Sequence, residues 1–141
     1  MISCTRRIEF DAAHRVMEHE SKCRHLHGHR YAVEATFEAP DLDTLGRVID
    51  FGKVREILGG WIDAQWDHTT ILNGADKPLG DVIAAKTGQS IFYIPGNPTA
   101  ERMADYLLRE VCPTLFDGSG ATCTRIILWE TPNCYAEARV N

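Results

Sequence analysis

The chain lacks long hydrophobic runs. No stretch of its 141 residues approaches the roughly 20 consecutive apolar residues that a membrane-spanning helix requires. The first residues, Met1 to Arg7, also lack the apolar segment of a secretory signal peptide. We therefore expect a protein that has no membrane partner and that works in the cytoplasm.

Basic residues are in deficit. Lys and Arg together number 15 against 20 Asp and Glu, which makes the formal net charge −5. Because proteins that bind nucleic acids usually carry a basic surface, we expect no nucleic-acid partner. The acidic balance does not exclude an anionic small molecule, since a single pocket can be positive on an acidic protein.

Regularly spaced cysteine pairs are also absent. The chain has an odd number of cysteines, and they are scattered along it: Cys4, Cys23, Cys112, Cys123 and Cys134. This distribution argues against the disulfide framework of small secreted proteins and favours reduced thiols in a cytoplasm.

What the chain does have is the composition of a globular protein. Hydrophobic residues make up 44% and charged residues 25%. A length of 141 residues suits one domain with an ordinary hydrophobic core. We therefore expect a single domain that spans residues 1–141.

Two segments near the N-terminus alternate apolar and polar residues with the period of a β-strand. In residues 6–14 the more apolar face carries Ile8 and Phe10 and ends at His14. In residues 29–38 the apolar face carries the odd positions from Tyr31 onward. The sequence therefore predicts two strands, each with one face turned to the interior.

The rest of the chain predicts helices followed by further strands. Apolar residues fall at helical spacing from 54 to 62 and again from 99 to about 111, where Cys112-Pro113 is expected to end the second helix. Strands are expected at 125–130 and 135–140. This order predicts an α+β fold of the ββααββ type, with a four-stranded antiparallel sheet and two helices on one face.

Residues 74–96 are the least regular part of the chain. A short helix at 79–86 and an apolar run at 91–94 are the only patterns that we identify there. We expect this segment to form a flap or an added contact near the site.

Three histidines point to a metal site. His14, His27 and His29 have the parity of the two apolar strand faces, so both strands could bring their imidazoles to one interior point. Imidazole nitrogens bind Zn²⁺, and three protein ligands leave one open position, as in catalytic zinc sites. Glu9 and Asp11 leave an iron site with a carboxylate ligand open as an alternative.

Cys23 lies four residues before His27 and has three interpretations. It could be a fourth zinc ligand in a closed structural site, an inert thiol, or a catalytic thiolate. Lys22, Arg24 and a nearby metal would all stabilise the thiolate form and lower its pKa. The sequence therefore favours the catalytic interpretation.

Two further acidic positions have a possible chemical role. Asp67 and His68 are adjacent, and a carboxylate that orients an imidazole makes a general acid–base pair. Side chains of neighbouring residues on a strand point to opposite faces, so a bond between these two requires a bend. Glu130 follows an apolar strand and could accept two parallel hydrogen bonds from an amidine-like ring edge.

An ordered set of short motifs resembles the pterin-synthase branch of the tunnelling fold. That branch includes enzymes that form 6-pyruvoyl-tetrahydropterin and bacterial enzymes of queuosine biosynthesis that form 6-carboxy-tetrahydropterin. The motifs extend over essentially the whole chain, at residues 10–14, 23–29, 48–51, 66–68, 72–73, 97–101 and 129–131.

The resemblance implies that His14, His27 and His29 bind zinc, that Cys23, His68 and Asp67 are catalytic, and that Glu130 anchors the pterin. It implies a homohexamer made of two trimers, each of which closes a barrel. In that family the active sites lie between subunits, so the Asp67–His68 pair would serve the zinc of a neighbour.

The implied reaction converts 7,8-dihydroneopterin triphosphate to 6-carboxy-tetrahydropterin, acetaldehyde and triphosphate. Three residues separate Cys23 from His27, a compact spacing that favours this queuosine branch over the pyruvoyl-forming one. Two alternatives stay open: a 6-pyruvoyl-tetrahydropterin synthase, and a non-catalytic protein that binds zinc or a pterin.

Overall fold

The two longest strands form the centre of the sheet. The computed structural model describes residues 1–141, in which β1 (Ser3–His14) pairs with β2 (His27–Glu38) along its whole length. The pairing is antiparallel and places Ser3 opposite Glu38 and His14 opposite His27. The apolar faces predicted from alternation are buried, which confirms both strands and the direction of their side chains.

The sheet has six strands and is mixed, so the prediction of four antiparallel strands was wrong. β5 (Thr122–Thr131) and β6 (Cys134–Arg139) continue the antiparallel sheet beyond β2. At the other edge, β3 (Thr69–Asn73) pairs in parallel with β1, and β4 (Ile91–Ile94) pairs in parallel with β3.

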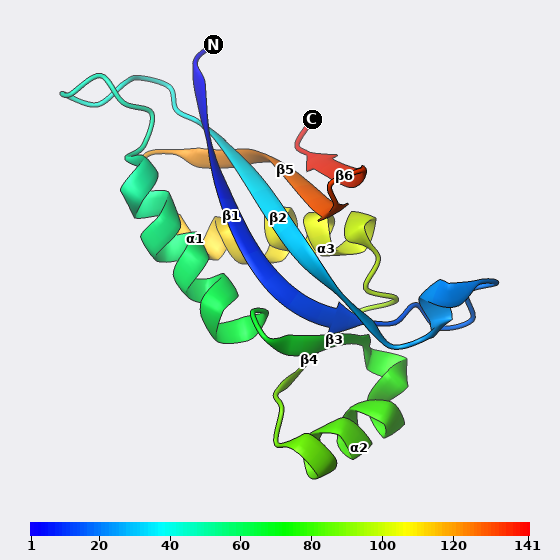
Figure 1. Cartoon of the computed structure of the whole chain (residues 1–141). Helices are drawn as coiled ribbons and strands as arrows, with labels where there is room; N and C mark the ends of the chain where they lie inside the picture. The colour runs from blue at the N-terminus through cyan, green and yellow to red at the C-terminus, as the bar shows by residue number, and fades with distance from the viewer.

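The strand order across the sheet is β4-β3-β1-β2-β5-β6. Of the two extra strands, β4 comes from the irregular part of the sequence, and β3 directly precedes that part. α2 (Lys77–Thr87) joins β3 to β4, and a crossover of this length is what parallel pairing requires. Figure 1 shows α2 beyond β3 and β4, at the end of the sheet. Residues 74–96 therefore extend the β1 edge by a strand and a third helix, which corrects the two-helix prediction.

The first predicted helix is confirmed as α1 (Phe51–Gln65), which packs against β1. The Asp50 side chain accepts a hydrogen bond from the Gly52 amide and so caps the helix N-terminus. Its buried face contains Val54, Leu58 and Ile62, as the helical spacing predicts. The helix ends at Trp66, directly before Asp67.

The second predicted helix is longer than expected. α3 (Ala100–Tyr106) starts at the Thr99 cap, continues through a wide turn at Leu107–Val111 and ends as α4 (Cys112–Leu115). Cys112-Pro113 does not stop the helix, because Pro113 lies in the first turn of α4, where a missing amide donor costs little.

The helices α1 and α3 cover one face of the sheet, with the hydrophobic core between them and β1, β2 and β5 (Figure 1). None of the helices combines the length and the apolar character needed to cross a membrane.

Candidate metal centre and active site

The three predicted histidines lie together at one end of the core. His14 is the last residue of β1 and pairs with His27, the first residue of β2, while His29 follows two positions later on the same face. Their ring centroids are 4.7 to 5.1 Å apart. One ligand nitrogen from each ring lies within 4.8 Å of the others, which is a spacing that one metal ion can bridge.

Backbone carbonyls orient two of these rings. Nδ1 of His14 lies 2.7 Å from the Pro98 carbonyl oxygen, and Nδ1 of His27 lies 2.7 Å from the His25 carbonyl oxygen. A carbonyl oxygen only accepts, so each Nδ1 carries the proton and each Nε2 keeps a free lone pair. This tautomer is the one that a metal ligand bonded through Nε2 requires.

Burial leaves the remaining nitrogens without partners. Nε2 of His14 and Nε2 of His29 are enclosed and make no hydrogen bond. Buried polar atoms are nearly always satisfied, so two orphaned nitrogens that face one point fit a metal ion. The donor set of three imidazoles suits Zn²⁺.

The electrostatics keep the rings of His14 and His29 neutral. Burial, reinforced by the neighbouring His27 and His29, lowers the pKa of His14 to about 4, although the Pro98 hydrogen bond opposes this. Burial also lowers the pKa of His29, against the opposing effect of Glu130. At neutral pH both residues are therefore in the uncharged form that binds metals.

Glu130 lies beside the cluster, near the end of β5. Its Oε1 is 3.5 Å from Nε2 of His29 and its Oε2 is 4.0 Å from Nε2 of His14. The carboxylate is about a quarter exposed. It therefore borders the side of the cluster that a small molecule could reach.

Cys23 is close in sequence but is not part of the cluster. It lies half-buried in a short helical turn at Lys22–Arg24, and its carbonyl oxygen accepts a hydrogen bond of 2.8 Å from the Val16 amide. The group of ligand atoms within mutual reach contains the three histidines and omits Cys23. The closed four-ligand interpretation of Cys23 thus has no support in this geometry.

Asp67 and His68 do form a pair, at the turn between α1 and β3. Oδ2 of Asp67 lies 3.0 Å from Nδ1 of His68. His68 has a positive φ of 59°, an uncommon conformation for a residue with a side chain, and this supplies the bend that the pairing requires. The backbone of Asp11 holds the turn: its amide donates to Asp67, and its carbonyl oxygen accepts from the His68 amide.

The Asp67 carboxylate is charged and can orient the His68 imidazole. Burial alone would raise the pKa of Asp67, but hydrogen bonds from the Asp11 amide and His68 outweigh it, so the pKa is lowered. Asp67 is therefore an anion at neutral pH and can fix the tautomer of His68. The His68 side chain is 78% exposed, so its free nitrogen is available to a molecule from outside.

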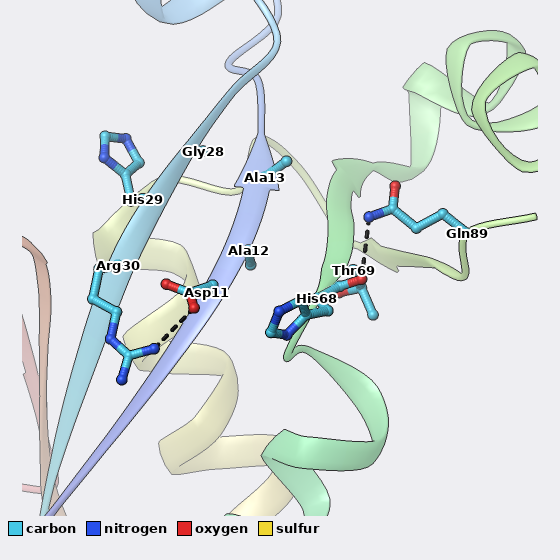
Figure 2. Close-up of a pocket in the computed structure, with 9 residues that line it drawn as sticks. All are labelled: Asp11, Ala12, Ala13, Gly28, His29, Arg30, His68, Thr69 and Gln89. Carbon is cyan, nitrogen blue, oxygen red and sulfur yellow. Dashed lines mark hydrogen bonds and ion pairs between the residues drawn. The ribbon is translucent and has the colours of Figure 1, made fainter. Parts of the chain in front are cut away.

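The pair and the histidine cluster lie on opposite faces of the sheet. His68 borders an open pocket of about 360 Å³ that Ala12 and His29 also line, and whose further strand residues include Asp11, Ala13, Gly28 and Arg30. These further positions alternate with those of the three histidines, so they face away from the helices. In Figure 2 the His68 ring lies beyond β1, whereas the His29 ring lies on the far side of β2.

Sequence reasoning did not identify Arg30 and Gln89, which also line this pocket. Arg30 is paired with Asp11 at 2.8 Å, and the Gln89 side chain donates to the His68 carbonyl oxygen at 3.1 Å. Charged residues on the outer face of a strand are common on any soluble protein, so no local signal distinguishes them. Gln89 reaches His68 only because β4 follows β3 in the sheet.

Solved structures share this fold. The chain aligns over 99% of its length with 98% of an uncharacterized protein from Wolinella succinogenes, at a TM-score of 0.82 and 23% identity. It aligns over 99% of its length with 96% of the 6-pyruvoyl tetrahydropterin synthase of Caenorhabditis elegans, at a TM-score of 0.69 and 20% identity. At these identities the likeness concerns the fold, which is that of pterin synthases.

Sequence comparison then identifies the family. Residues 3–141 match the model of the 6-pyruvoyl tetrahydropterin synthase family, and the chain belongs to that family. A protein of Rickettsia bellii named 6-carboxy-5,6,7,8-tetrahydropterin synthase is 49% identical over 137 residues, which cover 97% of this chain and 99% of the relative. A protein of the same name from Haemophilus influenzae is 28% identical, over 97% and 98% of the two chains. The protein is therefore an enzyme of pterin-synthase type.

Proposed function

We propose that this enzyme converts 7,8-dihydroneopterin triphosphate to 6-carboxy-5,6,7,8-tetrahydropterin, acetaldehyde and triphosphate, as a step towards queuosine. The observation that carries the proposal is near-full-length identity of 48 to 50% to four relatives that are named for the 6-carboxy product. The compact spacing from Cys23 to His27 agrees with this branch. The five free cysteines suit the reducing cytoplasm that the proposal assumes.

His14, His27 and His29 would hold a zinc ion through Nε2. When bound, zinc supplies Lewis acidity, which polarises side-chain hydroxyls of the substrate and acidifies the adjacent C–H bonds. The two orphaned nitrogens and the backbone-fixed tautomers support this assignment. Three protein ligands leave a coordination position for the substrate.

The proton transfers are assigned to Cys23 and His68. Cys23, as a thiolate between Lys22 and Arg24, would remove a proton from one side of the substrate's carbon chain. His68, held by the Asp67 carboxylate, would exchange a proton on the other side. Glu130 borders the histidine cluster and would bind the pterin ring edge through paired hydrogen bonds.

His68 would act on the substrate held by another subunit. Within one chain His68 is not part of the group of ligand atoms formed by the three histidines, and only His29 of that group lines the His68 pocket. A composite site between subunits would bring the two together, as in the proposed homohexamer of two trimers. The high exposure of the His68 ring supports a role towards a neighbouring chain.

The direct test is product identification. Zinc-loaded protein is incubated with 7,8-dihydroneopterin triphosphate, and the products are identified by mass. We expect acetaldehyde together with a 6-carboxy pterin, and loss of turnover by at least about 10²-fold in Cys23→Ala. Cys134→Ala is the matched control, because Cys134 is an exposed cysteine far along the chain. Full activity of Cys23→Ala would remove the thiol from the mechanism.

A second candidate is 6-pyruvoyl-tetrahydropterin synthase activity, which eliminates triphosphate and keeps all three side-chain carbons. The description of the matching family favours it, since the family is named for that product. A 6-pyruvoyl pterin without acetaldehyde would select this candidate. Absence of any turnover with zinc bound would favour a protein that only binds zinc or a pterin.

A further inference from the structure

The loop that follows β1 is held by the segment between β3 and α3. This loop, residues 15–26, contains Cys23 and joins the ligands His14 and His27. Its first residue, Arg15, forms a two-pronged ion pair with Asp76, in which each carboxylate oxygen accepts from a different guanidinium nitrogen. The Asp76 side chain is only 3% exposed, and its hydrogen bond raises the pKa of Arg15. Two parallel hydrogen bonds therefore join the first residue of the loop to a buried carboxylate.

Asp76 pairs with Arg15 and does not cap its own helix. It occupies the N-cap position of α2, where aspartate commonly accepts a hydrogen bond from the first helical turn. Here the side chain makes no capping hydrogen bond, because it is turned towards Arg15. The Asp76 side chain thus stabilises the loop after β1 and not the N-terminus of α2.

Asn97 holds the loop two residues further on. Its Oδ1 accepts from the Met17 amide at 3.0 Å, and its Nδ2 donates to the Met17 carbonyl oxygen at 3.1 Å. Asn73, at the end of β3, donates to the same Oδ1 at 3.1 Å and fixes the amide orientation. The next residue, Pro98, supplies the carbonyl that orients His14.

The constraint reaches Cys23 through Val16. Val16 lies between the two held residues, Arg15 and Met17, and its amide donates to the Cys23 carbonyl oxygen at 2.8 Å. Glu18, just beyond, has a positive φ of 63°, a conformation that persists only where the surroundings enforce it. The start of the loop is therefore held in one conformation.

We propose that residues 73–98 act as a clamp on the loop after β1, with Asp76 as a positioning residue for the metal ligand His14 and for Cys23. The effect on metal binding rests on the proposed metal site and any effect on turnover rests on the proposed reaction, whereas the effect on the loop rests on neither. The clamp gives the segment between β3 and β4 a role: it places Asp76, at the start of α2, beside Arg15.

The first experiment is hydrogen exchange on the metal-free protein. In Asp76→Asn the amides of Val16 and Met17 should exchange at least about tenfold faster than in the parent protein, since the neighbouring Arg15 is no longer held by the ion pair. Asp81→Asn is the matched control, because it removes a carboxylate from the same helix whose only partner is the exposed Lys77. Arg15→Lys provides a second variant, which keeps the charge and loses the fork geometry.

The second readout is Co²⁺ affinity, measured from the visible absorption of the bound ion. We expect Asp76→Asn to bind Co²⁺ about tenfold more weakly, as for loss of a group that supports a metal ligand. Exchange rates and Co²⁺ affinity equal to those of Asp81→Asn would overturn the clamp. Both effects in a protein that forms no pterin product would keep the clamp and reject the proposed function.

Discussion

The two clusters of ionisable residues differ in burial and in the backbone that builds them. His14 is 1% exposed, and the orphaned nitrogens of the histidine cluster are enclosed. The His68 side chain is 78% exposed and rests on a single turn at the end of α1. The cluster lies on the helix-covered face of the sheet, and the pair borders a pocket that is lined mainly from the other face, with His29 as its one residue from the cluster.

The difference in burial indicates that the histidine cluster and the Asp67–His68 pair have different roles. Three imidazoles, two of them with tautomers fixed by backbone carbonyls, form within one chain a set that could hold a metal ion. The Asp67–His68 pair is also held in one orientation by hydrogen bonds. The only feature beside it that could take a substrate is an open pocket. This supports the proposal that the pair completes the site of another subunit.

Breaking the cluster should have the largest effect. His29→Ala should abolish stoichiometric zinc binding and lower turnover by at least about 10³-fold, because two imidazoles hold the ion poorly. Metal content measured by mass spectrometry and product formation report the two losses. His19→Ala is the control, since His19 lies outside the cluster and pairs only with Glu20 among the carboxylates. Unchanged zinc content in His29→Ala would contradict the ligand assignment.

Breaking the pair should separate activity from metal binding. His68→Ala should lower kcat by about 10²- to 10⁴-fold, the usual range for a lost general acid–base group, with zinc content unchanged. Gln89→Ala serves as a control, because it removes a contact to the His68 backbone and leaves the ring in place. Loss of zinc in His68→Ala would mean that the two clusters are not independent.

The pH dependence of stability should sharpen the comparison. The folded, metal-free chain keeps His14 neutral down to its pKa of about 4, whereas the unfolded chain takes up this proton near the ordinary value of 6.5. The free energy of unfolding should therefore fall as the pH drops from 6.5 to about 4, by up to about 3 kcal/mol.

Asp67 affects the free energy of unfolding only at a lower pH than His14 does. In the folded chain the pKa of Asp67 lies below the ordinary value of 3.8. Its contribution to stability is therefore present above pH 3.8 and is lost only as the pH falls further. Urea unfolding between pH 7 and 4 should thus report mainly on the cluster. The slope should be clearly smaller in His14→Gln, and an identical slope in that variant would contradict the assignment.

Strand alternation explains why the cluster could be predicted. Because side chains alternate between the two faces of a strand, the positions of His14, His27 and His29 predicted that all three lie on one face, without knowledge of the strand pairing. The antiparallel register of β1 and β2 then brings their ends together. Zinc as the ion and the roles of Cys23 and Glu130 remain predictions.

Other features depend on contacts between residues that are distant in sequence. The bend at His68 is held by the backbone of Asp11, 56 to 57 positions earlier, and no local pattern encodes it. The parallel pairing of β3 and β4 likewise depends on the free edge of β1. The helix continued past Cys112 because a wide turn places Pro113 where its missing amide is tolerated.

The most direct test of the composite site is a mixing experiment. His29→Ala and His68→Ala proteins, each inactive alone, are unfolded together and refolded as mixed oligomers. If the pair serves a neighbouring subunit, some interfaces combine an intact cluster with an intact His68, and about a quarter of the parent activity should return. If cluster and pair must belong to the same chain, no mixture can regain activity, and that result would contradict the account.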